Sequence, residues 1–108
     1  MRVWQLREIE MPNGTRSPVV LDSVDSRAVL IDLAAGQELG EHQVRERAWV
    51  VVIDGAVDVD AADETITAGV GTLIEFDPTE RRTVRSADGS RLLILLAPWP
   101  GPGHYPPA

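Results

Sequence analysis

The sequence predicts an all-β fold, and three observations lead to that prediction. The chain has 108 residues, of which 44% are hydrophobic and 25% charged, an ordinary composition for one globular domain. Its apolar residues are mostly Val, Leu, Ile and Ala in short alternating runs, which favour strands over helices. Turn-forming residues recur roughly every eight to twelve positions, a spacing typical of a β-sandwich or barrel.

The first clear strand is predicted over Ser26–Leu33. Val29, Ile31 and Leu33 alternate with their neighbours, so these three side chains share one face of the strand. The same alternation places Leu30 on the opposite face.

The middle of the chain continues this pattern. Ala48–Ile53 is almost continuously apolar, as expected of a strand that is covered on both faces. The pair Asp54-Gly55 is a tight-turn signal, and Ala56–Asp60 fits the strand that returns from the turn. Further strands are predicted at 65–67, 72–76, 82–86 and 91–97.

The two ends of the chain differ from the middle. We assign 1–26 to an N-terminal arm with edge strands, 27–97 to a barrel and 98–108 to a C-terminal tail, all within a single domain. The tail is rich in proline and glycine, so it is expected to be an extended arm. Exposed strand edges favour pairing with a second chain, and a closed twofold contact is the commonest solution. We therefore expect a homodimer in which Trp4 or the run Val19–Leu21 crosses to the partner.

Charge and composition exclude several classes of protein. The net charge of −7 argues against binding to nucleic acid, which needs a basic face, and against a basic helix on a membrane surface. No apolar run approaches the roughly 20 residues of a membrane span. The absence of cysteine excludes disulfides and thiolate metal sites. The N-terminus lacks the pattern of a signal peptide, so a cytoplasmic protein is expected.

Two segments of the chain resemble the paired motifs of the cupin superfamily. The first runs from Gly36 through His42 to the turn at Gly55, and the second runs from Gly69 through Pro78 to Val84. The resemblance covers roughly residues 27 to 97. It implies an antiparallel double-stranded β-helix, or jelly-roll, barrel.

The metal ligands of that family are poorly matched. In the family, two histidines and a glutamate of the first motif and one histidine of the second usually hold a divalent metal. These four positions fall on His42, Val44, Ala48 and Arg82. Valine and alanine offer no lone pair, and arginine has donors only. We therefore expect no metal site of the family type, although weak binding of a divalent ion is left open.

The residues that stand in the cavity instead are His42, Glu46 and Arg82. If one regular strand continues from His42 to Val52, His42 and Glu46 share its inward face. Arg82 shares a face with the apolar Val84, which points it inward as well. Three interpretations remain open: Glu46 and Arg82 satisfy each other as an ion pair, Arg82 binds the carboxylate of a ligand, or His42 and Glu46 hold a weak metal ion.

These residues favour a cupin-type protein that binds a small metabolite, expected to be anionic, through His42, Glu46 and Arg82. The alternative is an enzyme. It would be a metal-dependent oxygenase, isomerase or lyase with atypical ligands, or a metal-free acid–base catalyst that uses His42. A purely structural or interaction module is the third class. The sequence does not identify a substrate.

Overall fold

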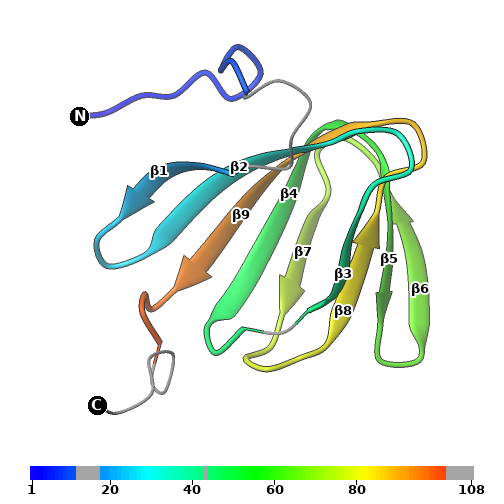
Figure 1. The fold of residues 1–108 in the computed structure, drawn as a ribbon. Helices are drawn as coiled ribbons and strands as arrows, with labels where there is room; N and C mark the ends of the chain where they lie inside the picture. The colour runs from blue at the N-terminus through cyan, green and yellow to red at the C-terminus, as the bar shows by residue number, and fades with distance from the viewer. Residues whose placement is uncertain (12–17, 43, 102–108) are drawn as a thin grey trace.

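A computed structural model describes residues 1–11, 18–42 and 44–101, with the side chains of 40–42 also outside the description. The described chain forms nine antiparallel strands in two sheets that face each other (Figure 1). The five-stranded sheet has the order β1-β2-β9-β4-β7. Its strands are β1 (Val19–Ser23), β2 (Arg27–Leu33), β9 (Ser90–Ala97), β4 (Arg47–Gly55) and β7 (Leu73–Phe76).

The four-stranded sheet has the order β3-β8-β5-β6. Its strands are β3 (Glu38–His42), β8 (Arg82–Arg85), β5 (Val57–Ala61) and β6 (Glu64–Ala68). The chain passes from one sheet to the other at β2–β3, β3–β4, β4–β5, β6–β7, β7–β8 and β8–β9. The all-β prediction is therefore confirmed. No helix among the described residues is long and apolar enough to cross a membrane.

The core lies between the two sheets, where the predicted alternation holds. In β2, Ile31 and Leu33 are buried in the core cluster, and Val29 on the same face is also buried. Leu30 is completely buried although it belongs to the opposite face. Apolar side chains are therefore buried on both faces of the five-stranded sheet at β2.

Gly55 ends β4 in the tight turn that the sequence predicts. Its φ of 72° lies in the left-handed region that glycine adopts without steric cost. A Cβ atom at this position would stand 2.2 Å from the carbonyl oxygen of Gly89. The turn therefore needs glycine both for its conformation and for the close approach of the neighbouring backbone.

The predicted single strand from His42 to Val52 is wrong. β3 ends at His42 in the four-stranded sheet, and β4 begins at Arg47 in the five-stranded sheet. β3 and β4 are thus separate strands in different sheets. Val44 and Glu46 nevertheless face inward as predicted, because Glu46 is buried and Val44 packs against the core.

The N-terminal segment crosses one end of the five-stranded sheet of its own chain (Figure 1). Arg91, at the start of β9, donates hydrogen bonds to the backbone carbonyls of Leu6 at 2.8 Å and Arg7 at 3.1 Å. Arg7 in turn lies 3.5 Å from the carboxylate of Asp54. These contacts fasten the segment at the end of the sheets where β2 finishes and β9 begins.

Candidate functional site

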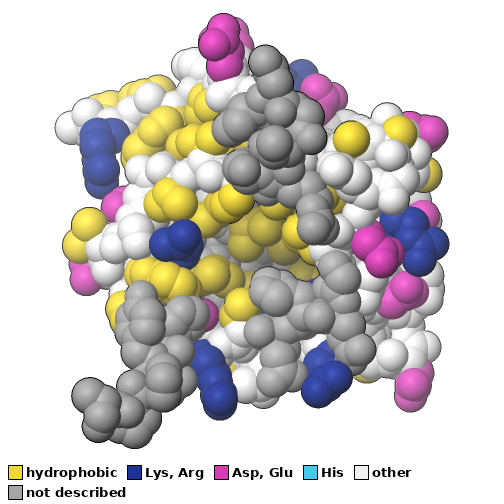
Figure 2. Space-filling view, in the orientation of Figure 1, with side chains coloured by type: hydrophobic (Ala, Val, Ile, Leu, Met, Phe, Trp, Pro, Cys, Tyr) yellow, Lys and Arg dark blue, Asp and Glu magenta, His cyan; other side chains and the backbone are white. Residues whose placement is uncertain are grey.

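A cavity of about 220 Å³ lies between the sheets at the end opposite the N-terminal segment. Among the described residues, its walls are apolar except for two arginines, Arg27 from β2 and Arg82 from β8. Figure 2 shows this face of the molecule, where hydrophobic side chains gather around a central hollow. Such an apolar pocket with a few convergent polar groups is the usual form of a small-molecule site.

Arg82 is the most buried charged group in the wall of this cavity. It is 6% exposed, and its guanidinium carbon lies 4.8 Å from the centre of the Phe76 ring. Its hydrogen bond to the carbonyl oxygen of Glu80 is long, at 3.4 Å. Among the side chains that the structure describes, no carboxylate lies within 4 Å of its guanidinium nitrogens. The prediction that Arg82 points inward beside Val84 is confirmed by the burial of both residues.

Burial lowers the pKa of the Arg82 guanidinium from its ordinary value, and the nearby Glu80 carboxylate opposes that shift. Desolvation outweighs the attraction of Glu80 because the cavity walls around the guanidinium are apolar. The group still carries its charge at physiological pH, since an arginine cannot be deprotonated in a protein. An anion that enters the cavity would therefore meet a desolvated cation with spare donors.

Glu46 has a different partner from the one that the sequence suggests. Its carboxylate is 1% exposed and accepts a hydrogen bond of 2.7 Å from the backbone N–H of Gly101. The expected ion pair with Arg82 is absent from the interactions of the described residues. Arg82 faces the Phe76 ring, whereas Glu46 holds the chain that follows β9. The ion-pair interpretation is therefore wrong.

His42 is placed by its backbone alone, because its side chain lies outside the described residues. It is the last residue of β3 and pairs with Arg82 across the two neighbouring strands. The candidate residues His42 and Arg82 therefore share one end of the four-stranded sheet. Glu46 lies at the same end of the fold, directly before the first residue of β4.

The sequence interpretation missed Arg27 and Trp99. Arg27 lines the cavity, and its guanidinium carbon lies 4.8 Å from the centre of the Trp99 ring. The backbone N–H of Trp99 donates to the carbonyl oxygen of Asp25 at 2.9 Å. Alternation within β2 could have found Arg27, since it is two residues before the inward-facing Val29. No local signal could have brought Trp99 to it from the tail.

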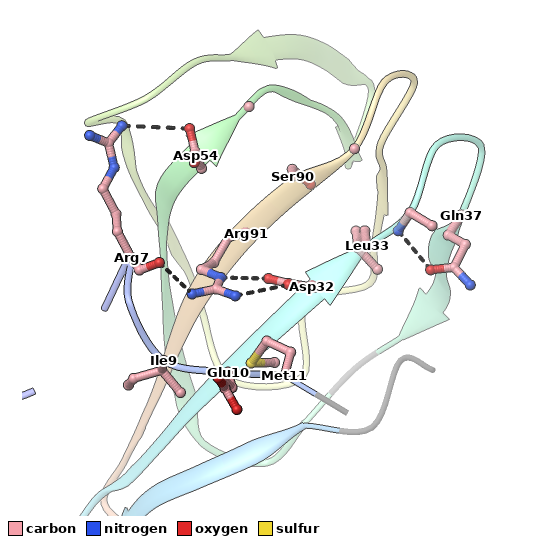
Figure 3. Close-up of a pocket in the computed structure, with 13 residues that line it drawn as sticks. Arg7, Ile9, Glu10, Met11, Asp32, Leu33, Gln37, Asp54, Ser90 and Arg91 are labelled. Carbon is pink, nitrogen blue, oxygen red and sulfur yellow. Dashed lines mark hydrogen bonds and ion pairs between the residues drawn. The ribbon is translucent and has the colours of Figure 1, made fainter. Parts of the chain in front are cut away.

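A second, open cleft of about 710 Å³ lies beneath the N-terminal segment (Figure 3). Arg91 stands in its centre and binds both carboxylate oxygens of Asp32, at 2.7 and 3.0 Å. Figure 3 shows Arg91 between Asp32 and the backbone of Arg7, whose side chain reaches Asp54. The principal charges of this cleft are thus engaged with one another, so the cavity with Arg82 is the better candidate site.

The positions where the cupin resemblance implies metal ligands do not fit a metal ion. Val44 contributes an apolar wall to the cavity, and Ala48 is completely buried in the core. Arg82 would place a fixed positive charge beside the ion. Within the described part of the chain, no three residues among His, Cys, Asp and Glu come together as a possible metal site.

Comparisons with known proteins show similarity at the level of structure. No family model matches the sequence, and no curated protein matches it. A Klebsiella pneumoniae protein with a double-stranded β-helix domain has 18% identity and a TM-score of 0.78, and the match covers 91% of this chain and 90% of that one. A cupin superfamily protein from Desulfitobacterium hafniense has 13% identity and a TM-score of 0.78, with 86% of each chain covered.

A cupin-2 domain protein from Shewanella frigidimarina is also similar, with 17% identity and a TM-score of 0.69 over 79% of this chain and 83% of that one. These neighbours have the same fold although their sequence identity to this chain is low. The resemblance that the two glycine-bounded segments suggest is thus supported by the arrangement of all nine described strands. The chain has the double-stranded β-helix fold of the cupin superfamily.

Proposed function

We propose that this cupin-fold protein binds a small carboxylate in the cavity between its sheets, with Arg82 as the group that receives the acid. The observation that carries the proposal is the setting of Arg82, a guanidinium buried in an apolar wall. Among the described residues it lies over an aromatic ring and has one long hydrogen bond. A buried cation without a carboxylate partner is costly to the empty fold.

A carboxylate would relieve that cost through the geometry of the guanidinium. The planar fork of arginine matches the two oxygens of a carboxylate, and hydrogen bonds between charged groups are shorter and stronger than neutral ones. The apolar walls, to which Val44, Ile94 and Leu96 contribute, would hold the hydrocarbon part of the molecule. The preferred ligand is therefore an acid with a short apolar body.

Calorimetric titration with pentanoate and with its uncharged analogue pentanamide tests the proposal. Pentanoate is expected to bind, and Arg82→Met is expected to weaken it by about 1.5–3 kcal/mol, the range for hydrogen bonds to charged groups. Arg85→Met is the matched control, because Arg85 is on the same strand but exposed, with Glu38 at 3.4 Å. Equal affinities of the Arg82→Met variant and the native protein for pentanoate would refute the proposal.

We also propose that two copies of the chain associate through the outer face of the five-stranded sheet. Trp49 and Leu95 are paired on that face, and Val51 is paired with Leu93 in β9 and with Leu73 in β7. Leu73 is 60% exposed, and the other four are half-buried. An apolar patch on a face that usually meets water is a common mark of an interface.

Light scattering tests this association. A homodimer would have twice the chain mass of 11.8 kDa, and Leu73→Glu is expected to shift the mass towards that of one chain by placing a charge in the patch. The control is Ile66→Glu on β6 of the other sheet, where the side chain is likewise exposed. A single-chain mass for the native protein at micromolar concentration would contradict the proposal.

A further inference from the structure

Arg27 is the second charged residue in the wall of the cavity. It lies on the inward face of β2, two residues before Val29, and is partly buried. The Trp99 ring supports its guanidinium at 4.8 Å, and its hydrogen bond to Ser23 Oγ is long, at 3.4 Å. Among the described side chains, it has no carboxylate within ion-pair distance. Arg27 therefore repeats the setting of Arg82: an aromatic support, a weak hydrogen bond and an apolar cavity.

This setting contrasts with that of five other arginines in the described part of the chain. Five arginines outside the cavity form ion pairs with carboxylates within the described chain: Arg2, Arg7, Arg47, Arg85 and Arg91. The chain carries seventeen acidic residues against ten basic ones, so carboxylates are plentiful. The two arginines in the cavity wall nevertheless have no carboxylate of the described residues within ion-pair distance. This arrangement leaves the carboxylates to be supplied by a ligand.

The strand register places Arg27 at one end of a row of paired residues, and Arg82 lies over the other end of that row. Arg27 of β2 pairs with Leu96 of β9, which pairs with Ala48 of β4, which pairs with Phe76 of β7. Three steps between strands separate the ends of this row by about 14 Å along the sheet. Arg82 reaches over the far end of the row from the other sheet, where it covers Phe76. The row between them is apolar, and Leu96 forms part of the cavity wall.

We infer that the ligand is a small dicarboxylate that spans the cavity, with one acid group on Arg82 and the other on Arg27. This inference rests on the proposed function and adds Arg27 as the residue that selects for the second charge. The cavity volume of about 220 Å³ corresponds to roughly seven water molecules at ~30 Å³ each. It therefore suits a chain of roughly four to six carbon atoms, whose methylene groups would lie against the apolar cavity wall.

Titration with glutarate, its isosteric monoamide glutaramate, and pentanoate separates the contributions of the two charges. Succinate and adipate, each with its own monoamide, extend the series to shorter and longer spans. Glutarate is expected to bind at least about tenfold more tightly than glutaramate, which is a difference of about 1.4 kcal/mol. In Arg27→Met the diacid and the monoamide should bind alike, whereas Arg82→Met should weaken both. Arg85→Met removes the same charge away from the cavity and should leave both affinities unchanged.

The outcomes distinguish this inference from the proposed function. If every monoamide binds as tightly as its diacid while Arg82→Met abolishes both, the single-acid site stands and the dicarboxylate inference is wrong. If the diacid retains its advantage in Arg27→Met, Arg27 is not the second partner, and the inference is likewise overturned. If no acid binds to the native protein, the proposed function itself fails. Circular dichroism and thermal melts of each variant establish that it is folded before its affinity is compared.

Discussion

Arg91 and Arg82 lie at opposite ends of the two-sheet structure, and both are largely withdrawn from water. Arg91 binds both oxygens of Asp32 and two backbone carbonyls of the N-terminal segment. Arg82 has the Phe76 ring and one distant carbonyl within the described structure. The hydrogen bonds to Asp32 raise the pKa of Arg91, whereas burial lowers the pKa of Arg82. The same type of side chain thus stabilises the fold at one end, as Arg91, and is available for a ligand at the other end, as Arg82.

The two arginines differ in whether their own chain fills their hydrogen-bond donors. A guanidinium whose donors are filled by its own chain fixes structure, because removing it leaves its partners without compensation. A guanidinium in an apolar wall without such partners costs free energy in the empty protein, so a ligand is the natural source of compensation. Three substitutions test this contrast through the free energy of unfolding.

Arg91→Met is expected to have the largest effect. It strands the Asp32 carboxylate and the carbonyls of Leu6 and Arg7, so we expect a loss of about 2–4 kcal/mol of stability. Urea unfolding measures the loss, and hydrogen exchange should show faster exchange in residues 1–11. Arg47→Met is the control, because the exposed pairs of Arg47 with Glu75 and Asp77 should be worth less than about 1 kcal/mol. Equal losses in the two variants would contradict the structural role of Arg91.

Gly101→Ala is expected to have a smaller effect, at the end that holds the cavity. An added Cβ would lie 3.0 Å from Cγ and 3.1 Å from Oε2 of Glu46, which crowds the carboxylate that accepts the Gly101 N–H. We expect a loss of about 1–2 kcal/mol, since a hydrogen bond to a charged group is weakened.

The matched control for that substitution is Gly69→Ala, because a Cβ at Gly69 would meet no atom within 4 Å. Nuclear magnetic resonance of the Gly101 amide gives a second readout, since its exchange with solvent should accelerate only in the Gly101→Ala variant. Similar stability and exchange in both variants would show that Glu46 does not hold this segment.

Arg82→Met should have the smallest effect and the opposite sign. Replacing a buried charge that forms no ion pair with the described residues by an apolar side chain of similar length is expected to stabilise the empty protein by about 1 kcal/mol. Thermal and urea unfolding without added acids measure this change. A large destabilisation would mean that Arg82, like Arg91, stabilises the fold and is not available to bind a ligand.

Much of the strand pattern could be predicted from the sequence because burial on one face imposes a period of two. The inward positions of Val29, Ile31 and Leu33 follow from that rule, and so does the burial of Arg82 beside Val84. The same rule misled at His42–Glu46. Val44 and Glu46 face inward as one regular strand would place them, although β4 begins only at Arg47 and β3 belongs to the other sheet.

The rest of the site depends on contacts between residues distant in sequence. Glu46 and Gly101 are 55 residues apart, and Arg27 meets Trp99 across most of the chain. Neither contact has a local signature, since the tail is recognisable only as rich in proline and glycine. The sequence could therefore propose Arg82 as a binding group, but the absence of a pair with Glu46 required the three-dimensional arrangement.

The central place of β9 in the five-stranded sheet has a consequence for how the protein is made. β9 lies between β2 and β4, yet it is the last of the described strands to leave the ribosome. Until then β2 has no partner on its inner edge, and the wall that carries Ile94 and Leu96 does not exist. Pairings between such distant segments form slowly, because the chain loses the entropy of closing a long loop before the strand contacts lower its free energy. β2 and β4 therefore remain unpaired along these edges until β9 has been synthesised, and exposed strands of this kind are prone to aggregate.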